Sequence, residues 1–362
     1  MAETLELQQV ICPSCKQVIT SFNPFQAEVE CPYCHNKAFN PLITAKKVPI
    51  PERIIVFKTT EKKFEQVMVK ALVERDYVPT DIFQCINTGK IIKVYLPMYL
   101  YEGTFTSSWS CKIAVEATQK DSSGNNETVT KYLPHTGNSQ GNFSFLSIAY
   151  DGKDIPKELI EFTKHYKYNK LSSVEYDPEL LGIGKDDSPL TLALNTDSVL
   201  TWNKYGEDYV NELADEKSLE QLSGEKIRDF RTSNSYNLKE KRHYMLAPFW
   251  FVYYTYNNEK HFFIMDGIAE NADMSFPVNQ EEVKYVKNRE AIKTLFTWIW
   301  PLYAVLWYFI DHQEFNLKVA FFFFALWLFP KLIIDYLMNA QIKTRLADSK
   351  HKREEAAKNI EL

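Results

Sequence analysis

Cys12-Pro-Ser-Cys15 and Cys31-Pro-Tyr-Cys34 are two short cysteine motifs near the start of the chain, separated by fifteen residues. In each motif a tight turn brings two thiolates to one ion from the same side. Zinc binds four thiolates tetrahedrally and has no redox chemistry, so a closed site of this kind stabilises a fold. The spacing is typical of such zinc sites. We therefore predict that residues 1–45 form a zinc ribbon in which Cys12, Cys15, Cys31 and Cys34 hold one structural Zn2+.

The composition of the 362-residue chain is that of a globular protein, with 45% apolar and 25% charged residues. A net charge of −5 argues against nucleic-acid binding, because no excess of cations is present to neutralise phosphates. The first residues, MAETLELQQV, lack the basic and apolar regions of a signal peptide. Paired cysteines favour a metal site in a reducing compartment, so we expect a cytosolic body. Cys85 and Cys111 are expected to be inert core thiols.

Residues 46–290 are predicted to form a mixed α/β cytosolic body with antiparallel strands, which makes the fold class α+β. Apolar residues at helical spacing predict helices, which cover 61–75, 154–166 and 205–230. β-Branched and aromatic residues predict strands, which cover 91–101, 109–118, 127–133, 242–256 and 262–265. The polar turn 121–126 would pair the second of these strands with the third.

A faint internal repeat is visible in this body. Leu96-Pro-Met-Tyr-Leu-Tyr101 resembles Ala247-Pro-Phe-Trp-Phe-Val252, and each is followed by a further aromatic segment. One interpretation is two related halves, at about 61–150 and 151–290. The alternative is coincidence among aromatic strands.

Two apolar runs near the C-terminus, at 295–310 and 317–337, predict a transmembrane hairpin over 291–340. A charged helical tail over 341–362 would extend the second span into solvent. Basic residues are frequent before the first run and after the second, but only Lys318 lies between them. This asymmetry predicts two spans with both termini cytosolic. The alternatives are a buried helical hairpin and a monotopic insertion.

Lys331 and Asp335 are charged residues within the second apolar run, four positions apart. The simpler interpretation is an ion pair near the membrane interface, with the lysine reaching toward water. The other is a polar contact that ties the hairpin to a partner helix. No further charged residues line both runs, so a transport path is not expected.

The sequence contains none of the common catalytic or nucleotide-binding motifs, such as GxxxxGK[ST], GxSxG or HExxH. We therefore expect a protein that is not an enzyme, with no small-molecule substrate. His35 follows Cys34 directly and is interpreted as a surface residue, because four thiolates already complete the metal site.

The order of these parts resembles that of a bacterial family. The chain combines a CPSC…CPYC ribbon, strand motifs around Leu96-Pro97 and Pro248-Phe-Trp250, and an apolar C-terminal hairpin. This is similar to membrane-anchored TFIIB-type zinc-ribbon proteins encoded beside flotillin-like SPFH proteins and PspA-type envelope-stress proteins. The resemblance implies that the four cysteines are zinc ligands. It also implies an adaptor that places a stress or remodelling partner at the bacterial inner membrane.

Three functions therefore remain open at this stage. The favoured one is a non-enzymatic zinc-binding adaptor whose partners are the lipid bilayer and SPFH/flotillin-like or PspA-like proteins. The second is a membrane-tethered zinc ribbon that binds nucleic acid, although the ribbon holds few basic residues. The third is an accessory subunit of a membrane enzyme or transporter, for which Lys331 and Asp335 are the only support.

Overall fold

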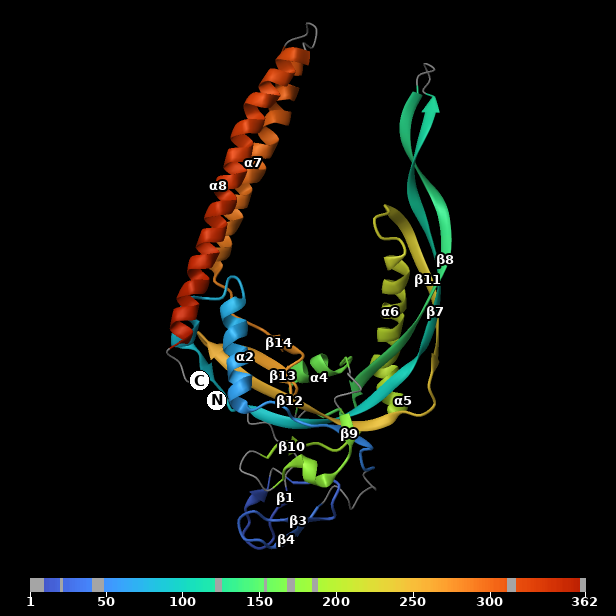
Figure 1. The fold of residues 1–362 in the computed structure, drawn as a ribbon, viewed down its shortest axis with the longest axis vertical. Helices are drawn as coiled ribbons and strands as arrows, with labels where there is room; N and C mark the ends of the chain where they lie inside the picture. Colours follow the sequence, from blue (N-terminus) through green and yellow to red (C-terminus); the bar gives the residue numbers. More distant parts are fainter. Residues whose placement is uncertain are drawn as a thin grey trace. The chain divides into compact units, whose positions relative to one another are not determined.

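The computed structural model describes residues 10–19, 22–40, 49–120, 126–152, 155–167, 173–183, 188–310 and 317–358 (Figure 1). The described chain forms two compact units that are interleaved in sequence. The first unit comprises Met1–Thr59, Ile91–Phe251 and Ile264–Asp273, and the second comprises Thr60–Lys90, Val252–Phe263 and Met274–Leu362. The domain boundaries expected from the sequence stay a prediction.

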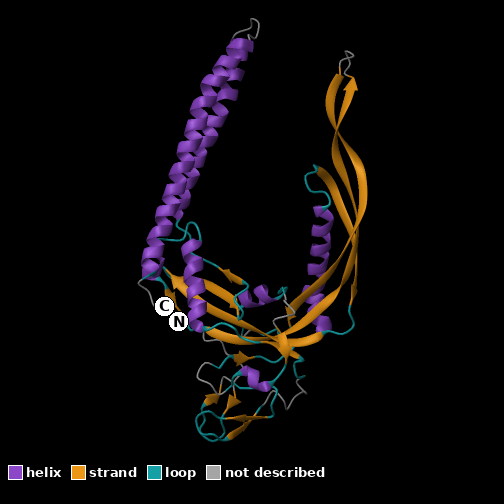
Figure 2. Cartoon of the chain, viewed as in Figure 1, coloured by secondary structure: helices purple, strands orange, loops and turns teal. Residues whose placement is uncertain are grey.

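Strands and helices both contribute to the fold (Figure 2). The strands are β1 Val10–Ile11, β2 Val18–Ile19, β3 Glu28–Glu30, β4 Lys37–Phe39, β5 Arg53–Ile55, β6 Asn87–Thr88, β7 Ile92–Lys120, β8 Asn126–Ile148, β9 Ser173–Glu175, β10 Leu190–Thr191, β11 Ile227–Leu238, β12 His243–Tyr256, β13 Glu259–Asp266 and β14 Ala272–Met274. The helices are α2 Glu61–Glu74, α3 Ile82–Cys85, α4 Lys157–Thr163, α5 Ser198–Thr201, α6 Glu207–Glu220, α7 Gln280–Ile310 and α8 Leu317–Ala357, with a 3-10 helix η2 Pro178–Leu181 and a π-helix η3 Trp202–Gly206.

The central feature is one large sheet to which ten of the described strands belong. Its main path runs β10-β7-β12-β13-β14, and β11 and β8 both pair with β7. Most pairs are antiparallel, although β10 pairs with β7 and β5 pairs with β12 in parallel. The α+β class and the predicted antiparallel strands are therefore confirmed.

β7 and β8 form a long antiparallel hairpin. The sequence suggested two separate strands at 91–101 and 109–118, whereas β7 is continuous over 29 residues. Its register with β8 is unbroken from Met98↔Ile148 to Lys120↔Asn126, which confirms the predicted pairing of 109–118 with 127–133. Residues 121–125 of the predicted turn lie outside the described part of the chain.

Glycines opposite aromatic residues allow this hairpin to pack closely. Gly137 pairs with Trp109 and Gly141 pairs with Phe105 across the two strands. A Cβ atom on Gly137 would lie 2.3 Å from the Trp109 ring, and one on Gly141 would lie 2.7 Å from the Phe105 ring. Each ring therefore occupies the space above its glycine, and a larger residue there would displace it.

Helix α6 covers one face of this part of the sheet, and its residues join an aromatic core. The buried members of this core are Tyr101, Phe105, Phe143, Phe145, Trp202, Val210 and Ala214. The helix predicted over 205–230 is correct up to Glu220, where α6 ends. The rest of that prediction is wrong, because Gly224 turns the chain at φ 89° and β11 then begins at Ile227. The β-branched and aromatic residues that follow pair with β7.

Helices α7 and α8 of the second unit pack against each other. Within the described residues, no helix is both long enough and apolar enough to cross a membrane. The predicted transmembrane hairpin over 291–340 is therefore wrong, and the expectation of two spans falls with it. The run at 295–310 has sixteen residues, fewer than the about 20 that a span needs, and it is the second half of a helix whose first half is charged. The second run is interrupted by Lys331 and Asp335.

Helix α8 continues through the residues predicted to form a solvated tail, so 317–357 is one helix. Two polar side chains near its C-terminal end, Ser349 and Arg353, are buried rather than solvated. Arg353 donates hydrogen bonds to the Val73 and Arg75 carbonyls at the end of α2 and to the Val78 carbonyl beyond it, and Ser349 hydrogen-bonds Glu282 of α7. These partners account for the burial, because polar groups enter a core only when they are hydrogen-bonded.

Candidate metal centre

Two equivalent turns place the four cysteines. Strands β1 and β2 flank the first turn, and β3 and β4 flank the second. In the first, the Cys12 amide donates to the Gln17 carbonyl and the Lys16 amide donates to the Cys12 carbonyl, both at 3.0 Å. In the second, the bonds Cys31 to Asn36 and His35 to Cys31 repeat this pattern at 2.9 Å.

Each turn is closed by a residue in the left-handed region. Lys16 has φ 60° and His35 has φ 57°, and each follows the second cysteine of its motif. Side chains adopt this conformation at a cost, which the surrounding hydrogen bonds offset. The repeated geometry directs both pairs of thiols toward one point.

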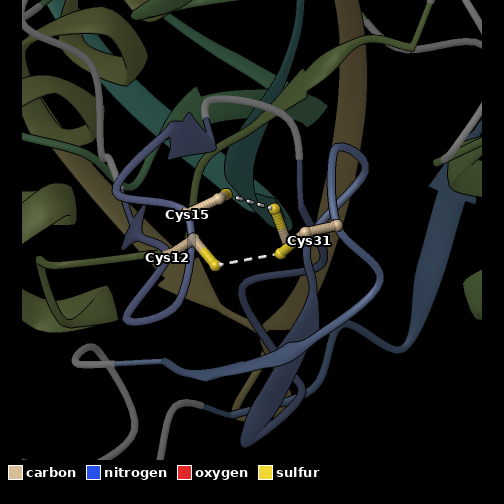
Figure 3. A group of neighbouring side chains, drawn as sticks. Cys12, Cys15 and Cys31 are labelled. Atoms are coloured by element: carbon tan, nitrogen blue, oxygen red, sulfur yellow. Dashed lines mark hydrogen bonds between the residues drawn. The ribbon is translucent and has the colours of Figure 1, made fainter.

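The four Sγ atoms lie together, all within 4.8 Å of one another. Cys12 Sγ is 3.6 Å from Cys34 Sγ, and Cys15 Sγ is 3.6 Å from Cys31 Sγ (Figure 3). Four sulfur atoms about 2.3 Å from a central zinc would be about 3.8 Å apart in a tetrahedron. The observed separations fit that geometry, so the cluster could hold one metal ion. The four residues predicted from the sequence are thus brought together, and their assignment as zinc ligands stays a prediction.

A small apolar core supports the cluster. Its buried members are Val10, Cys12, Ile19, Phe22, Val29, Cys31 and Ala38. Cys15 and Cys34 pack against it while remaining partly exposed. Few apolar side chains are available in so small a module, so a bound ion would supply much of its folding free energy.

The electrostatic environment favours a thiolate at Cys12. A hydrogen bond from the Cys15 backbone amide, opposed in part by burial, lowers the pKa of the Cys12 thiol to about 6. At Cys15, by contrast, a hydrogen bond from the Gln17 amide is outweighed by burial and the neighbouring thiols, which raise the pKa of Cys15 to about 12. Metal ligands must be deprotonated, so the Cys15 amide prepares one ligand, Cys12, for binding near neutral pH.

Asn40 joins two segments within the ribbon and Phe25 attaches the ribbon to its surroundings, and neither was identified from the sequence. Asn40 is fully buried, and its side-chain amide donates to the carbonyls of Pro24 at 3.1 Å and Gln26 at 2.9 Å. The Phe25 ring packs edge-on against Tyr176 and Tyr244 of the same unit, at centroid distances of 5.8 and 6.4 Å. A single asparagine or phenylalanine in a loop has no periodic neighbour, so no sequence pattern marks these roles.

The other residues singled out from the sequence lie apart from this cluster. The His35 ring is exposed and its Nδ1 lies 3.1 Å from Glu30 Oε1, which agrees with a surface role. Cys111 is buried as expected, but Cys85 is exposed, so its prediction as a core thiol is wrong: it is the last residue of the short helix α3. Lys331 and Asp335 form an ion pair at 3.6 Å within α8. Among the described residues, the four cysteines are the only group arranged to hold a metal.

In comparisons with known proteins, no protein-family model, no curated protein and no solved structure matches this chain.

Proposed function

We propose that this protein is a non-enzymatic adaptor whose structural zinc holds a ribbon that binds a protein partner. The carrying observation is the apolar surface that the ribbon exposes beside its metal centre. Tyr33, between the second pair of cysteines, is 63% exposed, and Phe39 on β4 is 57% exposed. Ile11 and Val18, which pair across β1 and β2, are exposed too. Four large apolar side chains exposed on so small a module are available for contact with a protein partner.

Zinc is the ion that best fits the donor set. Four thiolates form a soft ligand set, and zinc needs no change of oxidation state to bind it. A complete set of protein ligands also leaves no position for water or substrate, which favours a structural role over a catalytic one. The family resemblance supports an SPFH/flotillin-like or PspA-like protein as the partner.

The partner and the metal can be tested in one experiment on the full-length protein. Cys31→Ser removes one thiolate, and we expect loss of zinc together with loss of the partner captured by crosslinking in native membranes. Tyr33→Asp with Phe39→Asp should keep zinc and lose the partner, because it alters only the surface. Zinc content is measured by mass spectrometry.

Cys85→Ser is the matched control, because Cys85 lies outside the cluster, and it should keep both zinc and partner. Zinc retained by Cys31→Ser would contradict the metal assignment. The same captured proteins from the surface variant and the wild type would contradict the adaptor role.

We also propose that α7 and α8 associate with an anionic membrane surface without spanning it. Large apolar side chains on both helices are exposed, and they comprise Leu295, Trp298, Ile299, Phe329, Leu332, Ile333, Tyr336 and Leu337. Phe329 is 70% exposed and Tyr336 is 73% exposed. The Trp327 Nε1–H of α8 donates to the Phe296 carbonyl of α7 at 2.8 Å, which holds these two parts of the helices side by side. Apolar and aromatic side chains gathered in this way are typical of interfacial binding.

Basic residues next to the apolar side chains support this proposal. Lys293 lies five residues before Trp298 on α7, and Lys331, which is paired with Asp335, lies between Phe329 and Leu332 on α8. Each lysine or arginine near an anionic surface contributes about 1 kcal/mol of attraction. The cytosolic face of the bacterial inner membrane is the surface that the family resemblance implies.

Flotation with phosphatidylglycerol vesicles tests the membrane proposal. Trp298→Asp with Leu332→Asp should reduce binding at least about tenfold, because each buried apolar side chain contributes about 1.5–3 kcal/mol. Leu219→Asp, which changes an exposed leucine of α6, should bind like the wild type. Equal flotation of the double variant and the wild type would exclude these helices as the lipid-binding surface.

A further inference from the structure

The three strands β8, β7 and β11 form a part of the sheet whose two outer edges differ. The β11 edge carries Arg228 and Arg231, and its register shifts between them, where Asp229 has φ 54°. Charges and bulges of this kind prevent pairing with another strand. The β8 edge has neither device over 136–144, which contains no charged residue and no proline.

The hydrogen bonds of Leu146 show which backbone groups of β8 face this edge. Leu146 exchanges two hydrogen bonds with Tyr166, at 2.8 and 2.9 Å, so its N–H and C=O point away from β7. The register with β7 is unbroken, and backbone direction alternates along a strand. The N–H and C=O groups of residues 136, 138, 140, 142 and 144 therefore point outward as well.

The open part of the edge has defined limits. At one end, the outward N–H and C=O of Leu146 are already bonded to Tyr166. Pro134 lies at the other end. Because backbone direction alternates along β8, the nitrogen of Pro134 faces outward, and proline has no N–H to donate there. Among the described residues, one outward backbone group between these limits has a hydrogen-bond partner. The Asn138 carbonyl accepts a bond from Gln221 Nε2 at 3.1 Å. A carbonyl oxygen has two lone pairs and can accept a second bond.

The side chains along this edge are self-complementary. On the face away from α6, the exposed residues read Thr136, Asn138, Gln140, Asn142 and Ser144. This order is symmetric about Gln140 in chemical type, and every member is neutral. On the face toward α6, the Trp109 and Phe105 rings lie over Gly137 and Gly141, and Ser139 is buried with its hydroxyl 2.7 Å from that of Ser218, so this face holds no exposed charge.

We propose that the β8 edge pairs antiparallel with the β8 edge of a second copy of this chain, about a twofold axis at Gln140. This register places Thr136 opposite Ser144 and Asn138 opposite Asn142 of the other copy. Each of these residues then donates one N–H and accepts one N–H across the axis. Opposed neutral amides and hydroxyls can hydrogen-bond, and no like charges meet. An interface that uses one patch twice is the commonest form of homodimer.

Sedimentation velocity of the full-length protein in detergent tests this proposal. The wild type should be a dimer. Gln140→Lys places two positive charges opposite each other on the axis and should raise the dimer dissociation constant at least about tenfold. Thr106→Lys is the matched control, because Thr106 is exposed on the same face and pairs with Gln140 from β7, one strand away from the edge. It should dimerise like the wild type.

A charge-swap experiment tests the position of the axis. An equimolar mixture of Gln140→Lys and Gln140→Glu should form a heterodimer, since residue 140 of one copy faces residue 140 of the other. Circular dichroism should show that all the variants remain folded. A monomeric wild type would overturn the proposal and leave the edge to a strand from another protein. A Gln140→Lys protein that dimerises as tightly as the wild type would also overturn it.

Discussion

Arg353 is a buried cation whose partners are all backbone carbonyls. Its side chain is 1% exposed and its guanidinium donates to Val73, Arg75 and Val78 carbonyls, with the shortest bond, to Val78, at 2.7 Å. Helix α2 ends at Glu74 and has no basic residue in its last turn. The last carbonyls of a helix lack partners within it and carry a partial negative charge. Arg353 therefore supplies the C-terminal cap that α2 lacks in its own sequence, although burial lowers the pKa of its guanidinium.

Replacing Arg353 should destabilise the protein. Arg353→Met leaves buried carbonyls without donors, and we expect the free energy of unfolding to fall by about 3 kcal/mol. Lys352→Met removes the same charge from an exposed neighbour and should have little effect. Urea unfolding followed by circular dichroism provides the measurement. Equal midpoints for the two variants would mean that the cap contributes nothing measurable.

Element η3 is a π-helix between α5 and α6, and a histidine holds it in place. His165 follows α4, and its Nε2 lies 2.7 Å from the Tyr205 carbonyl of η3. Because a carbonyl only accepts, Nε2 carries the proton. The ring stacks on Tyr209 with a centroid distance of 4.5 Å. Burial, together with Lys164, lowers the pKa of His165 below its ordinary value of 6.5, and the Tyr205 carbonyl opposes this shift.

The lowered pKa predicts the pH dependence of stability. A group that holds its proton less tightly when folded contributes its full stability above the unfolded pKa, here 6.5. That stability is lost as the pH falls below 6.5 toward the folded pKa, because the unfolded chain then binds the extra proton. Thermal unfolding between pH 7 and 5 should show a smaller loss for His165→Gln than for the wild type. His135→Gln, at an exposed position, should follow the wild type, and identical slopes for all three proteins would contradict the role of His165.

At the scale of the whole molecule, local sequence patterns predicted what depends on neighbours in the chain. The cysteine spacing predicted that the four thiols lie together, and the apolar stripe of 61–75 predicted α2 almost to the residue. The continuity of β7 could not be predicted, because polar Ser107 and Ser108 interrupt its apolar pattern and only pairing with β8 and β11 explains them. The prediction of a membrane hairpin is wrong because the apolar runs are parts of longer, partly charged helices, whose full extent no apolar run in the sequence gives.

The cap on α2 also sets an order of events during synthesis. Val73 and Arg353 are 280 residues apart in the chain. Ribosomes add about 5–20 residues per second, so α2 is made about 14–56 s before its capping arginine. The last residue of the first unit is Asp273, so all of its residues have been made by then. The carbonyls at the end of α2 therefore gain their arginine donor only after nearly the whole second unit has been made.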